Sequence, residues 1–389
     1  MSFILFYTPH WQTMGGGEKY LLAMAEALAA DAGYRISLLS GSGALDRHAL
    51  ESYFSISLDR IQLQHVPARR IRPTLRTADI AVLMTNYRSL GLPAARTVYV
   101  LQVPYPAITA GTTLQTTFRG SFREAGKDLL RRRLLAACRK ASAVFVYSDF
   151  VRSALEEHHR LATTVLYPPI DDFAGTLPKE QAILSVGRIF RGAYNDKRYD
   201  VLIEAFSALR RRHPQSRWEY WIAGTCADDS ASQAWLAELK KRAEGYPVRF
   251  YVNAPYHTLA ELYGRASLFW HAAGYGVDER LHPERTEHFG MSPLEAMSAR
   301  CIPLVVNAGG TRETVEDGVS GFLWSTTDEL VSATSRLIES PALRASLGDG
   351  ARRRFARFSR ESFAGTVTSR FRDLENPTHS PNTTMVSFA

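Results

Sequence analysis

The feature that most constrains the fold of this chain is an alternation of short apolar runs with helical patterns, which occurs twice. In the first half, the helical patterns are clearest at residues 18–28 and 127–140. Several of the apolar runs are too apolar to have one face in water, which is typical of strands covered on both faces. The expected strands are residues 2–7, 35–39, 61–66, 79–84, 97–102 and 143–147. This alternation predicts a parallel sheet with helices on both faces.

A polar segment with Gly and Pro, residues 172–180, is typical of a linker, and the alternation restarts after it. The second unit is expected to contain strands at 182–186, 218–223, 248–252, 267–271 and 302–306, and helices at 199–213, 258–266, 293–299 and beyond 328. Ligands of open α/β sheets bind at the carboxyl ends of the strands, so two such units facing each other predict a central cleft.

The length of 389 residues exceeds what one core usually supports, so the chain is expected to be α/β with two doubly wound domains. The predicted domains are residues 1–170 and 181–355. A helix at 356–375 is expected to pack back on the N-terminal domain. Residues 376–389 are polar and interrupted by Pro, and we expect them to be disordered.

The sequence and its composition indicate in which cellular compartment the protein is expected. No apolar run approaches the roughly 20 residues needed to cross a bilayer. The N-terminus has neither the basic region nor the cleavage site of a signal peptide, so a soluble, cytoplasmic protein is expected. The cysteines Cys138, Cys226 and Cys301 are scattered without metal-ligand spacing, which argues against a disulfide framework and a zinc site.

The net charge of +8 is concentrated in the segment Arg119–Lys140, where eight Lys or Arg residues face only Glu124 and Asp128. Leucines interleave with them, which predicts a helix with an apolar face and a basic flank. Two interpretations stay open: a core-packed helix with solvated arginines, or attachment to anionic lipid head groups or a lipid-phosphate acceptor, which would place the protein at the inner face of a membrane. No nucleic-acid-binding motif is present, so no nucleic-acid partner is expected.

Residues 284–297 (E-R-T-E-H-F-G-M-S-P-L-E-A-M) place two carboxylates around a helix start. Ser292 is a good N-cap and Pro293 suits the first helical position. First-turn amides attract phosphate, while Glu287 and Glu295 can accept hydrogen bonds from sugar hydroxyls. Glu295 has an alternative role, because its spacing from Ser292 is that of a capping box.

Two further loops follow predicted strands. Gly15, Gly16 and Gly17 open a helix and offer bare N–H groups to an anion. In the second unit, Arg188 and Lys197 occupy one strand-to-helix loop and suit a diphosphate leaving group, although solvated loop charges would look the same. The chain has no Asp-x-Asp pair, so a carboxylate-held divalent ion is not indicated and the expected site is metal-independent, with no cofactor. The dinucleotide fingerprint and the P-loop are also missing, which argues against dehydrogenases and NTPases.

Together these pieces resemble the retaining GT-B glycosyltransferases of the fourth family, which includes mannosyltransferases and bacterial polysaccharide enzymes. The resemblance spans most of the chain, and Glu287 and Glu295 with their Arg and Lys partners are its specific part. The matching elements are G-G-G at 15–17, Y-P-P-I-D at 167–171, S-V-G-R at 185–188 with Lys197, W-I-A-G at 221–224, E-H-F-G-M-S-P-L-E-A-M from 287 and N-A-G-G-T-R-E from 307.

The resemblance implies two Rossmann-like domains, the first for the acceptor and the second for the nucleotide sugar. It implies that Arg188 and Lys197 hold the donor diphosphate, that Glu287 contacts sugar hydroxyls and that Glu295 contacts the ribose. The implied donor-binding residues are Gly16, Gly17, His271, Phe289, Gly290, Met291, Ser292 and Glu295. His271 has an equally good interpretation as a structural histidine.

This chain departs from the family at two positions. Gln102 stands on the acceptor side where many relatives carry His, and an amide cannot act as a base. Arg300 stands where relatives often have Gly, and we expect it to face solvent.

The expected function is transfer of a sugar from GDP-mannose or a UDP-sugar to a hydroxyl of a growing bacterial glycan, which can be lipid-linked, with retention at the anomeric carbon. A nucleotide-sugar epimerase or phosphorylase on the same scaffold is one rival. A basic membrane-associated adaptor without activity is another.

Overall fold

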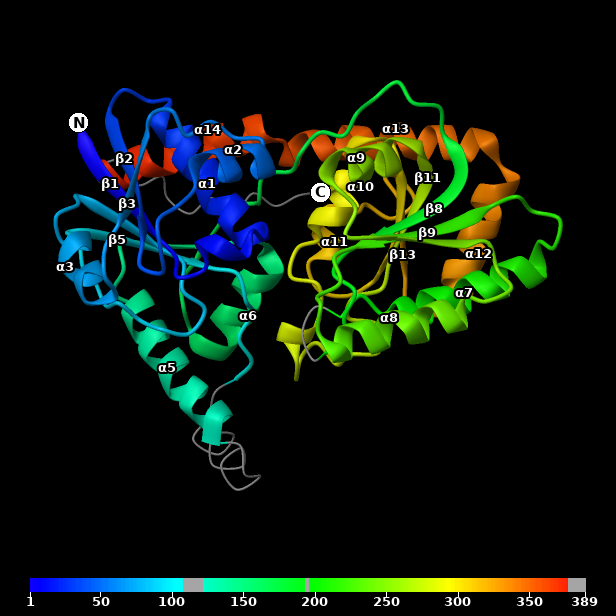
Figure 1. Ribbon diagram of the computed structural model, residues 1–389, viewed down its shortest axis with the longest axis horizontal. Coiled ribbons are helices and arrows are strands. Elements are labelled where there is room, and N and C mark those ends of the chain that lie inside the picture. Colours follow the sequence, from blue (N-terminus) through cyan, green and yellow to red (C-terminus); the bar gives the residue numbers. More distant parts are fainter. Residues whose placement is uncertain (108–121, 193–195, 377–389) are drawn as a thin grey trace.

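The computed structural model describes residues 1–107, 122–192 and 196–376 and shows two α/β units side by side (Figure 1). The first residues of the basic segment Arg119–Lys140, and the predicted disordered tail from residue 377 on, lie outside the described residues. Within the described residues, no helix is long and apolar enough to cross a membrane. Cys138, Cys226 and Cys301 are all buried and free.

The N-terminal unit is built on a seven-stranded, all-parallel sheet with the order β3-β2-β1-β4-β5-β6-β7. β1 lies in the interior of the sheet, and its Ile4, Leu5 and Phe6 are fully buried, as expected for a strand covered by helices on both faces. The strands are β1 (Ser2–Tyr7), β2 (Tyr34–Ser40), β3 (Ile61–His65), β4 (Ile80–Leu83), β5 (Arg96–Leu101), β6 (Ala143–Val146) and β7 (Thr164–Val165). The helices are α1 (Gly16–Ala29), α2 (Arg47–Phe54), α3 (Ile71–Leu75), α5 (Phe122–Cys138) and α6 (Asp149–His159).

The C-terminal unit repeats the design on a six-stranded parallel sheet with the order β10-β9-β8-β11-β12-β13. Its strands are β8 (Glu180–Val186), β9 (Glu219–Gly224), β10 (Val248–Val252), β11 (Ala266–His271), β12 (Ile302–Val306) and β13 (Phe322–Trp324). Its helices are α7 (Tyr199–Arg212), α8 (Ser230–Arg242), α9 (Tyr256–Arg265), α10 (Met291–Ser298), α11 (Thr311–Thr314), α12 (Thr327–Glu339) and α13 (Pro341–Phe355).

The two-sheet α/β fold predicted from the sequence is confirmed, and each predicted strand appears within two residues of its expected bounds. The short edge strands β7 and β13 were not predicted. They have two and three residues, too few to show a period.

The last helix, α14 (Arg360–Glu375), returns from the C-terminal unit and packs on α1 (Figure 1). Its buried Phe363, Val367 and Phe371 belong to the same apolar cluster as β1 and α1. Helix α14 therefore completes the core of the N-terminal unit and ties the two units together.

Direct packing also joins the two units. Tyr167, from the segment after β7, stacks on Phe289, which comes just before α10, with ring centroids 5.6 Å apart. Phe358 contacts both rings edge-on. Phe289 is 2% exposed, so this aromatic cluster forms a buried joint between the two units.

A second joint places the carboxylate of Glu313, on α11, at the start of α6. Its oxygens accept hydrogen bonds from the backbone amides of Asp149 and Phe150, at 2.7 and 2.6 Å. Burial raises the pKa of Glu313 to about 7, although the hydrogen bonds from these two amides lower it. The carboxylate of Asp149 also raises this pKa, and Tyr167 donates to Asp149 at 3.2 Å.

We expect this joint to weaken as pH rises. Because the folded pKa of Glu313 lies above its unfolded value, its contribution to stability is present below about pH 4.5 and lost as pH rises through about 7. The difference in unfolding free energy between wild type and Glu313→Gln should therefore fall over that window, by at most about 1.4 kcal/mol per pH unit. Urea denaturation at a series of pH values measures it, and a difference independent of pH would contradict the assignment.

The basic helix α5 buries part of its apolar face. Leu134, Leu135 and Cys138 are buried in the N-terminal core. Leu129 and Leu130 are exposed instead, at 52% and 38%.

Arg300, the departure from the family, is exposed as expected and has φ of 61°, a left-handed conformation that glycine adopts without strain.

Candidate functional site

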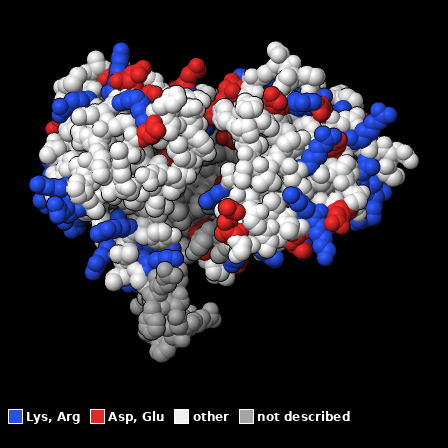
Figure 2. Space-filling view, in the orientation of Figure 1, with Lys and Arg blue, Asp and Glu red and all other residues white. Residues whose placement is uncertain are grey.

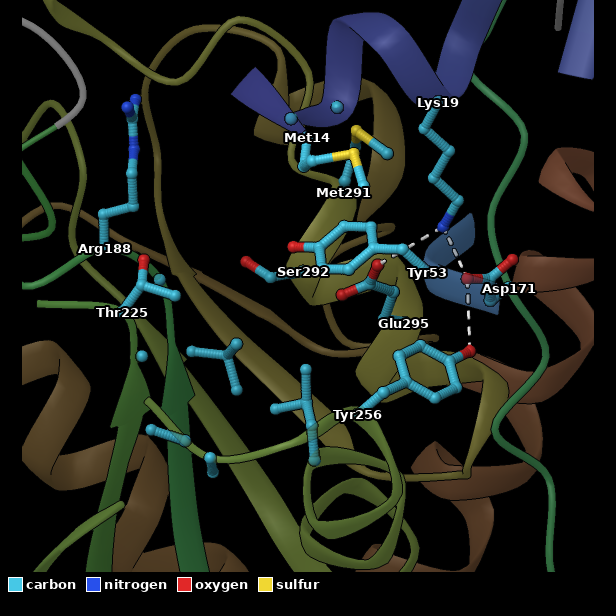
Figure 3. A pocket seen from close by; sticks show the side chains of 18 of the residues that line it. Met14, Lys19, Tyr53, Asp171, Arg188, Thr225, Tyr256, Met291, Ser292 and Glu295 are labelled. Atoms are coloured by element: carbon cyan, nitrogen blue, oxygen red, sulfur yellow. Dashed lines mark hydrogen bonds and ion pairs between the residues drawn. The ribbon is translucent and has the colours of Figure 1, made fainter. Parts of the chain in front are cut away.

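A cavity of about 500 Å³ lies between the two units, where the space-filling view shows the surface hollowed (Figure 2). The carboxyl ends of β8 and β9 form one wall, and α1 and α2 contribute the other. Figure 3 shows Lys19, Asp171, Tyr256 and Glu295 gathered on one side, with Arg188 across the cavity. The lining residues are Met14, Gly15, Gly16, Lys19, Tyr53, Phe54, Asp171, Phe173, Val186, Gly187, Arg188, Lys197, Ala223, Gly224, Thr225, Ala254, Tyr256, Leu259, Glu287, Met291, Ser292 and Glu295.

The start of α10 forms part of the floor, two residues earlier than the sequence predicts. Gly290 is the N-cap, with φ of 100°, and the helix begins at Met291. The prediction of Ser292 as N-cap is wrong, because Ser292 is already the second helical residue and no side chain caps this helix. Met291 and Ser292 still line the cavity, where first-turn amides have no partner within the helix.

Glu295 is not part of a capping box. Its Oε2 accepts a hydrogen bond from the phenol of Tyr263 at 2.8 Å, and its Oε1 lies 4.0 Å from the ammonium of Lys19. Burial raises the pKa of Glu295, although Lys19 and the Tyr263 hydrogen bond lower it. The carboxyl group therefore faces the cavity with partners from both units and has no bond to the backbone of Ser292.

Glu287 sits at the centre of a charged group. Its Oε2 accepts from the ammonium of Lys197 at 2.7 Å and lies 3.1 Å from Nε2 of His271. Burial would raise the pKa of Glu287, but Lys197 and His271 together hold it well below its ordinary value. Glu287 is therefore a permanently ionised acceptor and not a proton donor near neutral pH.

His271 lies behind Glu287 and not on the cavity wall. Burial lowers its pKa, so the imidazole is neutral, and it is 3% exposed. Because a carboxylate can only accept, Nε2 must carry the proton, and the buried Nδ1 has no hydrogen-bond partner among the described residues. The structure places His271 as an orienting partner of Glu287.

Arg188 lines the cavity at the end of β8, and its guanidinium lies over the ring of Phe190, 5.3 Å from the centroid. The two predicted cations, Arg188 and Lys197, therefore reach the same cavity, and Lys197 is already paired with Glu287.

Gly224 ends β9 beside these cations and allows two loop backbones to touch. A methyl group added there would lie 1.8 Å from the carbonyl oxygen of Gly187. We expect Gly224→Ala to destabilise the protein by about 1–3 kcal/mol through overpacking. Gly175→Ala is the control, because nothing lies within 4 Å of its added methyl. Equal midpoints of the two variants in urea would contradict this assignment.

Gly16 and Gly17, at the start of α1, lie in different environments. Gly16 lines the cavity, where its added methyl would meet Sδ of Met291 at 3.1 Å. Gly17 does not line it and faces the side chain of Gln102, which also contacts Met84. Gln102 therefore lies against α1 at the edge of the site. Phe289 and Gly290 are also off the cavity wall, the first in the aromatic joint and the second as the cap of α10.

A charged hub at Asp171, the last residue of Y-P-P-I-D, was not predicted from the sequence. Lys19 of α1 pairs with its Oδ2 at 2.6 Å, and Tyr256 of α9 donates to the same oxygen at 3.3 Å. Arg360 of α14 pairs with Oδ1 at 2.7 Å. The motif and the position of Lys19 after the glycine loop were visible, but their contact spans 152 residues and has no local signal.

No three His, Cys, Asp or Glu side chains within residues 1–107, 122–192 and 196–376 are grouped so that they could hold a metal ion.

Comparison with known families agrees with this architecture. The model of the family described as Glycosyltransferase Family 4 matches residues 14–172, and that of Glycosyl transferases group 1 matches residues 170–354. The crystal structure of HepE from Anabaena, in complex with UDP and glucose, superposes with a TM-score of 0.69 over 96% of this chain and 100% of that chain, at 18% identity. This likeness shows the fold.

Mannosyltransferases are among the curated relatives of the chain. The chain is 28% identical to the Xenopus laevis GDP-Man:Man(3)GlcNAc(2)-PP-Dol alpha-1,2-mannosyltransferase over 52% of this chain and 42% of the relative. It is 25% identical to the lipopolysaccharide core mannosyltransferase LpcC of Rhizobium leguminosarum bv. viciae over 61% of this chain and 66% of the relative. The chain thus spans about half the length of the curated relatives it matches. With both family matches and the two-sheet fold, the chain belongs to the GT-B glycosyltransferases of the family 4 type.

Proposed function

We propose that the protein transfers a sugar from a nucleoside diphosphate donor to a hydroxyl of a glycan, with retention at the anomeric carbon and without a metal ion. One observation carries the proposal: an ionised Glu287, paired with Lys197, faces the same interdomain cavity as Arg188 and the start of α10. Cations and unpaired amides suit the diphosphate, and a fixed carboxylate suits sugar hydroxyls.

The charges suggest how the donor lies. The diphosphate would contact Arg188, Lys197 and the first amides of α10, which stabilise the charge that develops as the sugar leaves. Glu287 would accept hydrogen bonds from the sugar, and Glu295, on the next turn of α10, from the ribose. Gly16 closes the cavity from the other unit, so binding would complete a site whose parts come from both domains.

Retention is proposed without a carboxylate nucleophile. Glu287 is already held by Lys197 and His271, and its low pKa makes it a poor base. The leaving phosphate would help to deprotonate the acceptor hydroxyl, because Gln102 cannot. The product's anomeric configuration by NMR tests this, and inversion would overturn it.

The donor is proposed to be GDP-mannose or a UDP-sugar. Thermal-shift measurements with GDP, UDP and ADP identify the base, because a ligand that binds only the folded state raises its stability by mass action. Incubation with nucleotide sugars, with and without glycan acceptors, then tests transfer. An altered nucleotide sugar formed without acceptor would favour the epimerase rival. If none of the three nucleotides stabilised the protein, the proposal would be contradicted.

We further propose a role in bacterial polysaccharide biosynthesis with a lipid-linked acceptor, and contact of α5 with the cytoplasmic face of a membrane. The exposed Leu129 and Leu130 on a basic helix support this contact. Flotation with phosphatidylglycerol vesicles should recover the wild type, and Leu129→Ser with Leu130→Ser should reduce recovery. Equal recovery with phosphatidylcholine vesicles would contradict an electrostatic attachment.

A further inference from the structure

A second cavity, of about 720 Å³, opens at the carboxyl ends of β1, β2 and β4 in the N-terminal unit. It shares no lining residue with the interdomain cavity. The lining residues are Tyr7, Pro9, Gly41, Ser42, Ala68, Arg69, Ile71, Arg72, Thr85, Arg88, Ser89, Leu90, Gly91 and Arg133.

Four arginines converge on this cavity from different parts of the chain. Arg69 and Arg72 come from the segment around the start of α3, Arg88 from the loop after β4 and Arg133 from α5. No Asp or Glu is among the lining residues, and none of the four arginines pairs with a carboxylate in the described part of the chain. All four side chains are exposed, so solvent and salt screen their mutual repulsion, and an anion bound among them would provide the missing counter-charge.

An unused hydroxyl points to a ligand independently of the charges. Thr85, two residues after the end of β4, is 3% exposed, and its buried Oγ1 has no hydrogen-bond partner in the described chain. A buried hydroxyl without a partner costs free energy that a bound acceptor oxygen would recover. Ser42 and Ser89 line the same cavity. Tyr7 also lines the cavity. Burial raises the pKa of its phenol, although the charge of Arg88 lowers it, so the phenol stays protonated and can donate a hydrogen bond.

We propose that this cavity binds a phosphate or diphosphate group carried by the acceptor. Guanidinium groups hold phosphate oxygens in paired hydrogen bonds, and the set of four arginines with hydroxyl donors matches a multiply charged anion. The loop between β1 and α1 links the two cavities, since Pro9 lines this one while Met14, Gly15 and Gly16 line the other. An acceptor anchored here would extend along that loop toward the donor, so as a statement about the acceptor the inference rests on the proposed function.

Modification of arginines by phenylglyoxal, mapped by mass spectrometry, tests the site in the intact protein. Inorganic pyrophosphate at about ten times its Kd should slow modification of Arg72 and Arg88 about tenfold, by mass action. Arg76, which is exposed at the end of α3 and lines neither cavity, is the internal control in the same sample. Sodium chloride of equal ionic strength corrects for screening.

Two further comparisons, one with lipid vesicles and one with variants, complete the modification experiment. Phosphatidylglycerol vesicles, compared with phosphatidylcholine vesicles, separate a lipid-borne phosphate from a soluble one: protection by the former alone supports a lipid source, and by pyrophosphate alone a soluble source. In the variant Arg72→Gln with Arg88→Gln, protection of Arg69 and Arg133 should be lost, whereas Arg76→Gln should keep it. Unchanged reactivity in every arm, or equal slowing at Arg76, would overturn the site.

Arg188 reports on the donor site in the same spectra. Its protection by a nucleoside diphosphate depends on the proposed function and not on the arginine cavity. Lack of protection at Arg188 would therefore count against the donor site, whereas lack of protection at Arg72 and Arg88 would count against the arginine cavity.

Discussion

Replacing Glu287 with Ala is expected to lower kcat by about 10²–10³ while the protein stays folded. The carboxylate is the ionised acceptor facing the proposed donor site, and its loss also frees Lys197, whose Nζ now lies 2.7 Å from Oε2. Glu287→Gln keeps an acceptor oxygen but removes the charge, so it should fall between wild type and Glu287→Ala. Initial rates with saturating donor and acceptor measure the effect, and circular dichroism checks the fold.

Glu244→Gln is the matched control, because Glu244 is exposed beyond the end of α8 and lines neither cavity. It should leave the rate unchanged. A Glu287→Ala enzyme with wild-type turnover would contradict the proposed role of this carboxylate. If a membrane-related activity persisted in that variant without any sugar transfer, the adaptor rival would be favoured instead.

Replacing Asp171 with Asn is expected to destabilise the protein by about 3–5 kcal/mol, the cost typical of removing one partner from a buried ion pair. The side chains of Asp171 and Lys19 are each 10% exposed, and Arg360 pairs with the same carboxylate. Because Lys19 belongs to the N-terminal unit and Tyr256 of the C-terminal unit donates to the same carboxylate oxygen, the substitution should also loosen the contact between the units. Urea denaturation measures the loss of stability, and small-angle X-ray scattering the radius of gyration.

The neighbouring Asp172 provides the control. It pairs with Arg352 at 2.6 Å, but the side chains of the pair are 46% and 33% exposed. Exposed pairs contribute only about 0–1 kcal/mol, so Asp172→Asn should have a small effect. Equal losses in the two variants would contradict the assignment of Asp171 as the hub.

The same hub predicts sensitivity to acid. Burial would raise the pKa of Asp171, but Lys19 and Arg360 outweigh it and lower the pKa. A depressed folded pKa means that the stabilisation is present above the unfolded pKa of about 4 and is lost as pH falls through the folded value. The wild type should thus lose stability below about pH 4 more steeply than Asp171→Asn, a window separate from that of Glu313.

Much of the fold was predictable because local periodicity reports burial. The strands of both sheets have runs of apolar residues, and parallel strands covered on both faces leave that pattern wherever they occur. The helix after Gly290 was also predicted, but its first residue was not. Ser292 and Pro293 are good capping residues by type, whereas the backbone turn is made by Gly290 at φ of 100°.

The candidate site was predictable in its residues and not in its contacts. Arg188, Lys197, Glu287 and Glu295 were selected from the sequence, and all four line one cavity. Their partners were not predicted, because Lys197 and Glu287 are 90 residues apart and Tyr263 and Glu295 are 32 apart. The arginine cavity was missed for the same reason, since its charges come from separate segments.

By itself, the sequence determined the two parallel-sheet units, the strand-end loops that carry charge, and the resemblance to a glycosyltransferase family. Only the tertiary structure decided that Glu287 is ionised between Lys197 and His271, that Asp171 joins three segments, and that four arginines line one cavity with Thr85. The physical reason is one of range. Helix and strand patterns repeat every two to four residues along the chain, whereas the charge state of a buried group depends on neighbours that packing brings in from distant segments.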